Sequence, residues 1–262
     1  MKLNSQQLAV QEQFEKQSSN YGSSHQILSH LEDLQSLVPY VSIPAHAPAL
    51  DIATGGGHTA LFLARMGCEV TASDISEAML EVARRLAAAE GFSIHTRQHA
   101  AEELPYPAES FAIVSCRVAP HHFTNPAHFV QEAVRVLMPG GFLIIIDTTV
   151  PDDSPEAAQW LDRVEKLRDP SHVRLIPPAE WLSLCRQAGL ETQFWHVTPV
   201  KQLDLEEHFR RANTPMENRK EVLRLVEEAS PVVRESYRIT KEEEKITWFW
   251  PRLGLVARKA MD

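Results

Sequence analysis

Short runs of apolar residues alternate with amphipathic stretches of helical periodicity through the middle of the chain. Strands and helices that alternate in this way predict a parallel sheet covered by helices on both faces. The run at 142–146 is apolar without interruption, which is typical of a strand buried on both faces. The predicted strands span residues 49–53, 69–74, 93–98, 111–116, 142–147, 190–197 and 246–258.

Amphipathic helices are predicted ahead of the first strand and between the later ones. Two of them, at 5–18 and 25–38, are separated by a turn-like break and followed by a proline-rich connector. Ser76 is expected to cap the helix that follows the second strand. The other predicted helices span 59–66, 126–137, 155–167 and 178–188.

The chain is less regular after residue 150. Residues 203–228 predict helix with a break near Pro215. If the last two strands pair as a hairpin, an insertion of roughly 40 residues lies between them, and connections this long often form a lid or a substrate wall. We expect one domain over 1–262, made of an N-terminal helical cap (1–44), a ligand-binding core (45–150) and substrate-side elements (151–262) with a helical insertion at about 201–243.

Composition narrows the possible partners and the location. A net charge of −9 with no basic run argues against a nucleic-acid partner. The polar residues 1–10 do not resemble a secretory signal, and the longest apolar run is far too short to span a membrane. The three cysteines are scattered, which suits a reducing compartment, so a cytoplasmic protein is expected.

Three adjacent glycines, Gly55, Gly56 and Gly57, stand where the first predicted strand turns into a helix. Glycines there let the backbone approach a ligand closely, and the amides at the helix start attract a negative group. Asp51 precedes the glycines and Asp74 ends the second strand, where a carboxylate can accept hydrogen bonds from both hydroxyls of a ribose. Because ligands of open parallel sheets bind over the carboxyl ends of the strands, the pattern indicates a nucleoside site.

The identity of the nucleoside depends on Asp51. Residues 55–60 also satisfy the G-x-G-x-x-A pattern of dinucleotide-binding proteins, which places a pyrophosphate on the helix. A carboxylate at Asp51 would repel a pyrophosphate but suits the ammonium of an amino-acid moiety, which favours S-adenosylmethionine. A nicotinamide-dependent oxidoreductase and a non-catalytic protein that binds S-adenosylmethionine remain as alternatives.

Several motifs in a fixed order extend this interpretation. They are the D-x-x-x-G-x-G loop at 51–57, the acid at Asp74, the A-E-x-L-P stretch at 101–105, the double histidine at 121–122 and the R-V-L-x-P-G-G turn at 135–141. With these motifs the chain resembles the class I S-adenosylmethionine-dependent methyltransferases, in the UbiE-like branch of ubiquinone/menaquinone-biosynthesis enzymes. The resemblance covers roughly residues 45–150. Ala100 stands where the family usually has an aspartate that binds the adenine amino group.

The resemblance implies a Rossmann-like sheet of seven strands with the last one antiparallel, and S-adenosylmethionine as cofactor, with S-adenosylhomocysteine as its product. Glu102 or a backbone group then replaces the missing adenine-binding aspartate. The cofactor-binding residues that it implies are Asp51, Ala53, Thr54, Gly55, Gly57, Asp74, Ile75, Met79, Ala101, Glu102 and Arg117.

His121 and His122 follow the fourth strand, near the expected position of the methyl group, and either is a candidate general base. Both can equally cap the next helix or pack in the core. Arg117 is expected to bind either an anionic substrate group or an internal carboxylate. The residues expected to contact the substrate are Tyr21, His25, His122, His172 and Arg174.

The methyl acceptor is expected to be a small molecule, such as a quinol, a phenol or a thiol. The sequence leaves open whether carbon, oxygen, sulfur or nitrogen accepts the methyl group, and whether the protein is a monomer or a homodimer. Adjacent histidines diverge and no second cluster has ligand spacing, so no metal site is expected.

Overall fold

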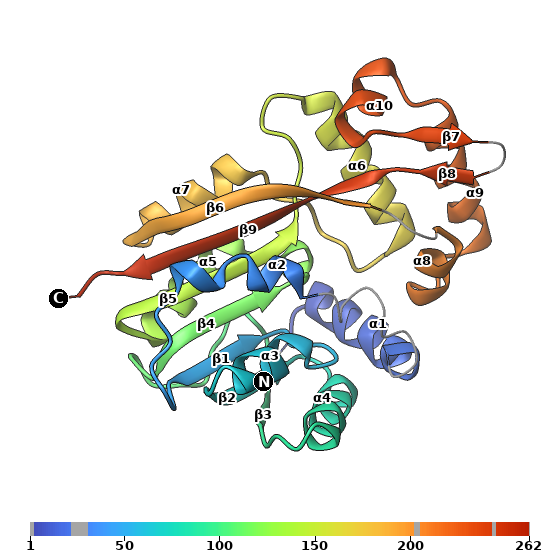
Figure 1. The fold of residues 1–262 in the computed structure, drawn as a ribbon. Coiled ribbons are helices and arrows are strands. Elements are labelled where there is room, and N and C mark those ends of the chain that lie inside the picture. Colours follow the sequence, from blue (N-terminus) through green and yellow to red (C-terminus); the bar gives the residue numbers. More distant parts are fainter. Residues whose placement is uncertain (1–2, 22–30, 202–204, 243–244, 262) are drawn as a thin grey trace.

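The computed structural model describes residues 3–21, 31–201, 205–242 and 245–261. Within these residues seven strands form one mixed sheet in the order β3-β2-β1-β4-β5-β9-β6, in which β9 runs antiparallel to both of its neighbours (Figure 1). The predicted Rossmann-like sheet and its antiparallel last strand are therefore confirmed. The strands are β1 (Pro48–Ile52), β2 (Glu69–Asp74), β3 (His95–Gln98), β4 (Phe111–Arg117), β5 (Leu137–Thr148), β6 (Leu190–Lys201) and β9 (Phe249–Lys259).

Helices cover both faces of this sheet. One face packs on α5 (Pro126–Val136) and α7 (Pro178–Gln187). The other packs on α3 (His58–Arg65) and on residues 31–41, and α4 (Glu77–Ala89) lies beside α3. The Ser76 hydroxyl accepts a hydrogen bond from the Met79 amide, as expected of a helix cap.

The surroundings of strand β5 explain why its sequence is continuously apolar. Leu143 and Ile145 belong to the hydrophobic cluster on the α5 and α7 face, whereas Ile144 and Ile146 belong to the cluster on the α3 face. Both sets are almost completely buried, because neither face of this strand meets water. The prediction from the uninterrupted apolar run is confirmed.

The insertion between β6 and β9 contains α8 (Leu205–Arg211), α9 (Met216–Glu227), α10 (Pro231–Tyr237), β7 (Thr240–Glu242) and β8 (Lys245–Thr247). These elements share a third hydrophobic core with α6 (Pro155–Arg168) and form a lobe beyond the end of the sheet (Figure 1). The expected break near Pro215 is confirmed, since Pro215 caps α9. The sequence did not predict α10 or the hairpin of β7 and β8.

The N-terminal region differs from the prediction. The first helix, α1 (Ser5–Tyr21), runs longer than expected. The second predicted helix, at 25–38, is wrong over its described part, where only α2 (Glu32–Gln35) forms, and a 3-10 turn (Val38–Tyr40) follows it. Pro39 accounts for the early end, because proline lacks the amide donor that a continuing helix needs and disfavours helical backbone before it.

In the described part of the chain, no helix is long and apolar enough to cross a membrane. The same residues contain no group of three or more His, Cys, Asp or Glu side chains that could hold a metal ion.

Gly57→Ala tests how tightly the glycine turn packs on α4. Gly57 has φ of 86°, and a Cβ there would lie 2.7 Å from Cβ and 2.8 Å from Cα of Ala83. We expect a loss of about 3 kcal/mol in the free energy of unfolding, from left-handed strain and overpacking together. Gly67→Ala is the matched control, because Gly67 has φ of 88° with nothing within 4 Å, and about 1 kcal/mol is expected. Urea denaturation measures both variants, and equal losses would contradict the packing constraint.

Candidate functional site

A pocket opens at the carboxyl edge of the sheet, where β1, β2 and β4 end and the strand order reverses between β1 and β4. Such a switch point is the usual ligand site of an open parallel sheet. Helix α1 lies across it and completes the wall. The pocket is lined by Gln7, Val10, Phe14, Ala53, Thr54, Gly55, Gly56, His58, Thr59, Asp74, Ile75, His99, Ala101, Glu102, Arg117, Val118, Ala119, His122 and Phe123.

The backbone around the pocket adopts unusual conformations. Ala53 and Gly55 have φ of 52° and 53°, so the loop after β1 turns sharply before α3 begins at His58. Val118, directly after β4, has φ of 54°, which is rare for a β-branched residue and is held in place by a hydrogen bond from its amide to the Ile146 carbonyl. Strain of this kind concentrates at functional sites, and both loops face the pocket.

Asp74 presents a carboxylate to the pocket from the end of β2. Its two oxygens accept hydrogen bonds from the amides of Gly55 and Ser76, each at 2.9 Å. Burial raises the pKa of Asp74 to about 6, although these amides favour the charged form. A ligand that donates further hydrogen bonds would therefore stabilise this carboxylate.

Asp51 lies at the end of β1, just before the loop that contains Ala53 and Gly55. Its oxygens accept hydrogen bonds from the hydroxyls of Ser115 at 2.7 Å and Thr54 at 2.6 Å. Burial raises the pKa of Asp51 to about 6 as well, and the nearby charge of Asp74 adds a small increment. Two carboxylates with raised pKa values thus stand at neighbouring strand ends.

Glu102 joins the N-terminal helix to the core. One of its oxygens accepts a hydrogen bond from Gln7 of α1 at 2.9 Å, and the other accepts from the amide and hydroxyl of Thr124 at 3.0 Å. Other glutamines of α1 are bound in the same way, because Gln6 donates to the Ser171 carbonyl and Gln11 to the Ile75 carbonyl. Helix α1 is therefore fastened to the core on both sides of the pocket.

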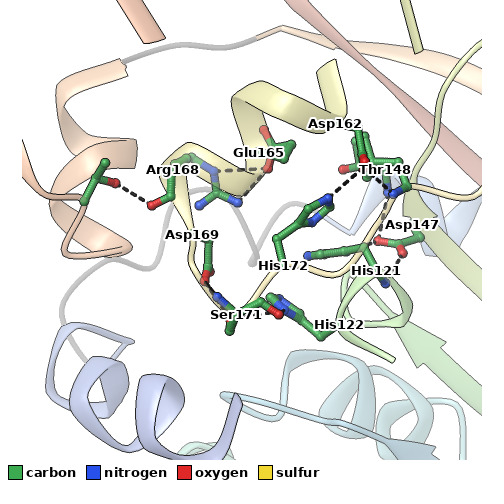
Figure 2. Close-up of polar contacts among 12 residues, drawn as sticks. His121, His122, Asp147, Thr148, Asp162, Glu165, Arg168, Asp169, Ser171 and His172 are labelled. Atoms are coloured by element: carbon green, nitrogen blue, oxygen red, sulfur yellow. Dashed lines mark hydrogen bonds and ion pairs between the residues drawn. The ribbon is translucent and has the colours of Figure 1, made fainter. Parts of the chain in front are cut away.

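The two histidines have different hydrogen-bond partners (Figure 2). Of the two, only His122 lines the pocket. His122 Nδ1 lies 3.1 Å from the Ser171 carbonyl oxygen, so this nitrogen must carry the proton. The Ser171 hydroxyl, 3.2 Å from the same nitrogen, donates to Asp169. Nε2 of His122 is therefore left with its lone pair. Burial, followed by the charge of His121, lowers the pKa of His122, which is consequently neutral at pH 7.

His121 is held behind the pocket by Asp147 of β5. Its Nδ1 lies 2.7 Å from one carboxylate oxygen and its amide donates to the other (Figure 2). Burial acts to lower the pKa of His121, but the attraction of Asp147 outweighs burial and raises it. The double histidine is thus one neutral ring facing the pocket and one ring whose pKa Asp147 raises.

Arg117 lines the far wall of the pocket and is also paired with a carboxylate. Its Nε donates to both oxygens of Asp33, at 3.1 and 3.0 Å, and its side chain is buried. Of the two roles expected for this arginine, the internal carboxylate is thus observed. The pair also ties residues 31–41 to the end of β4.

Comparison with known proteins decides the family. A family model described as a methyltransferase domain matches residues 50–145. The methyltransferase YcgJ of Bacillus subtilis (strain 168), itself uncharacterised, is 32% identical over 87% of this chain and 89% of its own. The chain belongs to the class I S-adenosylmethionine-dependent methyltransferases.

Solved structures agree with this assignment. The crystal structure of YcgJ matches with a TM-score of 0.83 at 28% identity, covering 89% of this methyltransferase and 100% of YcgJ. That of a Bacillus halodurans C-125 protein gives 0.82 at 32% identity, covering 87% and 99%. The demethylmenaquinone methyltransferase of Clavibacter sepedonicus is 32% identical over 64% of this chain and 69% of its own.

The residues that the sequence predicted for the site of this methyltransferase fall into three groups. Nine of them line the pocket: Ala53, Thr54, Gly55, Asp74, Ile75, Ala101, Glu102, Arg117 and His122. Four lie behind the lining: Asp51, Gly57, Met79 and His121. Two form pairs outside the lining: His172, buried behind His121 with 5.5 Å between ring centroids, bonds Asp162, and Arg174 pairs with Glu180. Tyr21 ends α1 with a side chain outside the described residues, and His25 lies outside them altogether.

Sequence reasoning missed two features of the site. Gln7, Val10 and Phe14 of α1 line the pocket, and their spacing of three and four residues is the signal that could have identified them. The orientation of His122 by Ser171 and Asp169 had no such signal, because these residues lie about 50 positions away and meet His122 only through the fold.

Proposed function

We propose that this methyltransferase transfers the methyl group of S-adenosylmethionine to a small-molecule acceptor whose reacting atom faces His122. One observation carries the proposal. A single pocket, covered by α1, is lined by the glycine loop and Asp74 and also by the neutral side chain of His122. Bound S-adenosylmethionine supplies an electrophilic methyl group on a sulfonium.

The residues of this chain fit that cofactor. The Asp74 carboxylate, with a pKa raised by burial, gains by accepting hydrogen bonds from ribose hydroxyls. Asp51 lies beneath Ala53 and Thr54 and provides negative charge for the ammonium of the methionine moiety. Ala101 and Glu102 lie beside the adenine in this arrangement, with Glu102 in the place of the aspartate that Ala100 lacks.

His122 acts as the proton acceptor in this proposal. Ser171 fixes the tautomer, so Nε2 offers its lone pair to a hydroxyl, thiol or amine on the acceptor. Phe14 of α1 packs edge-on against the histidine ring, 5.2 Å between centroids, and helps to exclude water from the site. Alignment of the acceptor with the methyl group then supplies most of the acceleration.

The similarity to the demethylmenaquinone methyltransferase favours a quinol or phenol as acceptor, with thiols as the next class. The same proposal places the protein in the cytoplasm, as a monomer or homodimer without a nucleic-acid partner.

Two other functions would fit the same pocket less well. A nicotinamide-dependent oxidoreductase would have to place a pyrophosphate over Asp51, and a non-catalytic binder would leave the orientation of His122 unexplained.

Asp74→Ala tests the cofactor assignment. S-adenosylhomocysteine should raise the Tm of the wild-type protein, because a ligand that binds only the folded state stabilises it. NAD should not. In the variant the affinity should fall by roughly 10- to 100-fold, through loss of charge-assisted hydrogen bonds. Asp153→Ala, an exposed aspartate away from the pocket, is the control and should bind normally. Undiminished binding in Asp74→Ala, or a larger shift with NAD, would contradict the assignment.

His122→Gln tests the proton acceptor. With a radiolabelled methyl donor and a panel of quinols, phenols and thiols, we expect kcat on the acceptor that reacts to fall by roughly 100-fold or more. The Kd for S-adenosylhomocysteine should change only a few-fold. His95→Gln, at an exposed position of β3, is the control. A kcat that His122→Gln leaves unchanged would assign His122 to packing alone.

A further inference from the structure

Arg252 is a buried cation outside the ion pairs described above. It lies near the start of β9, opposite Thr148 of β5 and Thr198 of β6, and only 8% of its surface is exposed. Its Nε is buried without a hydrogen-bond partner among the residues that the structure describes. Buried polar groups in folded proteins are almost always hydrogen-bonded, and an unpaired buried charge destabilises the fold, so this arginine requires an explanation.

The carboxylates near Arg252 already bond to other side chains. Three of them act on its charge, namely Asp33, Asp147 and Glu165. Asp33 pairs with Arg117 at 3.0 Å, Asp147 lies 2.7 Å from His121, and Glu165 pairs with Arg168 at 2.7 Å (Figure 2 shows the last two). Each of these carboxylates therefore bonds to a side chain other than Arg252.

Asp33, Asp147 and Glu165 favour the positive charge of Arg252, but burial and Arg117 oppose it more strongly. Burial, and then the charge of Arg117, lowers the pKa of Arg252, which means that both oppose its positive charge. Two further buried atoms in the same region have no partner in the described structure, Nδ1 of His172 and one oxygen of Glu165. Glu165 acts on both Arg252 and His121, so these groups belong to one polar region behind His122.

The position of Arg252 relates it to the acceptor rather than to the cofactor. It is absent from the lining of the pocket that contains the glycine loop and Asp74. The charge of Arg117, which lines that pocket, acts on Arg252. The neighbouring strand β5 carries Asp147, which holds His121 next to His122. Arg252 thus stands on the side of the site where the reacting atom of the acceptor is proposed to lie.

We infer that Arg252 is a specificity residue that receives an anionic group of the methyl acceptor, a carboxylate or a phosphate. A guanidinium presents parallel N–H donors that match either group in a two-pronged hydrogen-bonded pair. The inference rests on the proposed methyl transfer and narrows it, because the acceptor then carries both a proton-bearing nucleophile for His122 and an anion for Arg252. The rival explanation is a buried water that links Arg252 to Glu165 and has no role in binding.

The test measures the Kd of paired probes by calorimetry, with the protein saturated by S-adenosylhomocysteine. The carboxylate arm compares the hydroxybenzoates with the corresponding hydroxybenzamides, and the phosphate arm compares phenyl phosphate with phenol. The wild-type protein should bind the anionic member of at least one pair roughly tenfold more tightly or better, as expected for a charge-assisted pair. Arg252→Met should abolish this preference, and Arg252→Lys should keep part of it.

Controls separate this inference from the proposed function and from a structural role. Arg258→Met, at the other end of β9, should leave the preference intact. The Tm of ligand-free Arg252→Met should rise, because an uncompensated buried charge is removed. Equal affinity for anionic and neutral probes in every pair, or a preference that survives in Arg252→Met, would overturn the inference. Failure of the wild-type protein to bind S-adenosylhomocysteine would instead overturn the proposed function.

Discussion

The arrangement of the pocket depends on two carboxylates that are buried at neighbouring strand ends. Water is excluded from Asp51 and Asp74, and hydroxyl and amide donors replace it only in part, so both pKa values are raised to about 6. The sign of the linkage follows from this shift, since a raised pKa in the folded state means that the ligand-free protein loses stability as pH rises from about 4 through 6. In the proposed function, a ligand with an ammonium and two hydroxyl donors would relieve that penalty, so the two residues would destabilise the free protein and favour the bound one.

The remaining parts of the site are arranged around this edge. The loop with positive φ at Ala53 and Gly55 carries its amides to Asp74, and α1 closes the pocket through Gln7 and Glu102. Across the pocket, His122 is neutral, and His121 behind it is held by Asp147. Behind that pair, Nε of Arg252 is buried without a hydrogen-bond partner in the described structure, and this is the observation from which we infer an anionic acceptor.

The fold of the core could be predicted from the sequence because its signals are local. The apolar run of β5, the Ser76 cap and the glycines after β1 each report the burial or backbone geometry of their own segment. The position of the glycine loop and Asp74 in the pocket lining followed from the same signals, since they lie within about 25 residues of each other.

The acceptor side depends on contacts between distant residues, and there the prediction was incomplete. Arg174 and His172 form a polar cluster in sequence, but the fold pairs them with Glu180 and Asp162 instead of directing them into the pocket. The helix expected at 25–38 failed in its described part because Pro39 outweighed the apolar periodicity. Pairings of this kind have no periodic signature, so only the tertiary structure reveals them.

The most direct measurement of the two-carboxylate site is the number of protons released when S-adenosylhomocysteine binds. Calorimetric titrations in two buffers with different ionisation enthalpies give that number at any pH. At pH 6 Asp51 and Asp74 are partly protonated in the free protein, and binding should lower their pKa values, so protons should be released, whereas release from these groups should vanish at pH 8. Binding at pH 6 with no proton released, or with protons taken up, would contradict a ligand held by these two carboxylates.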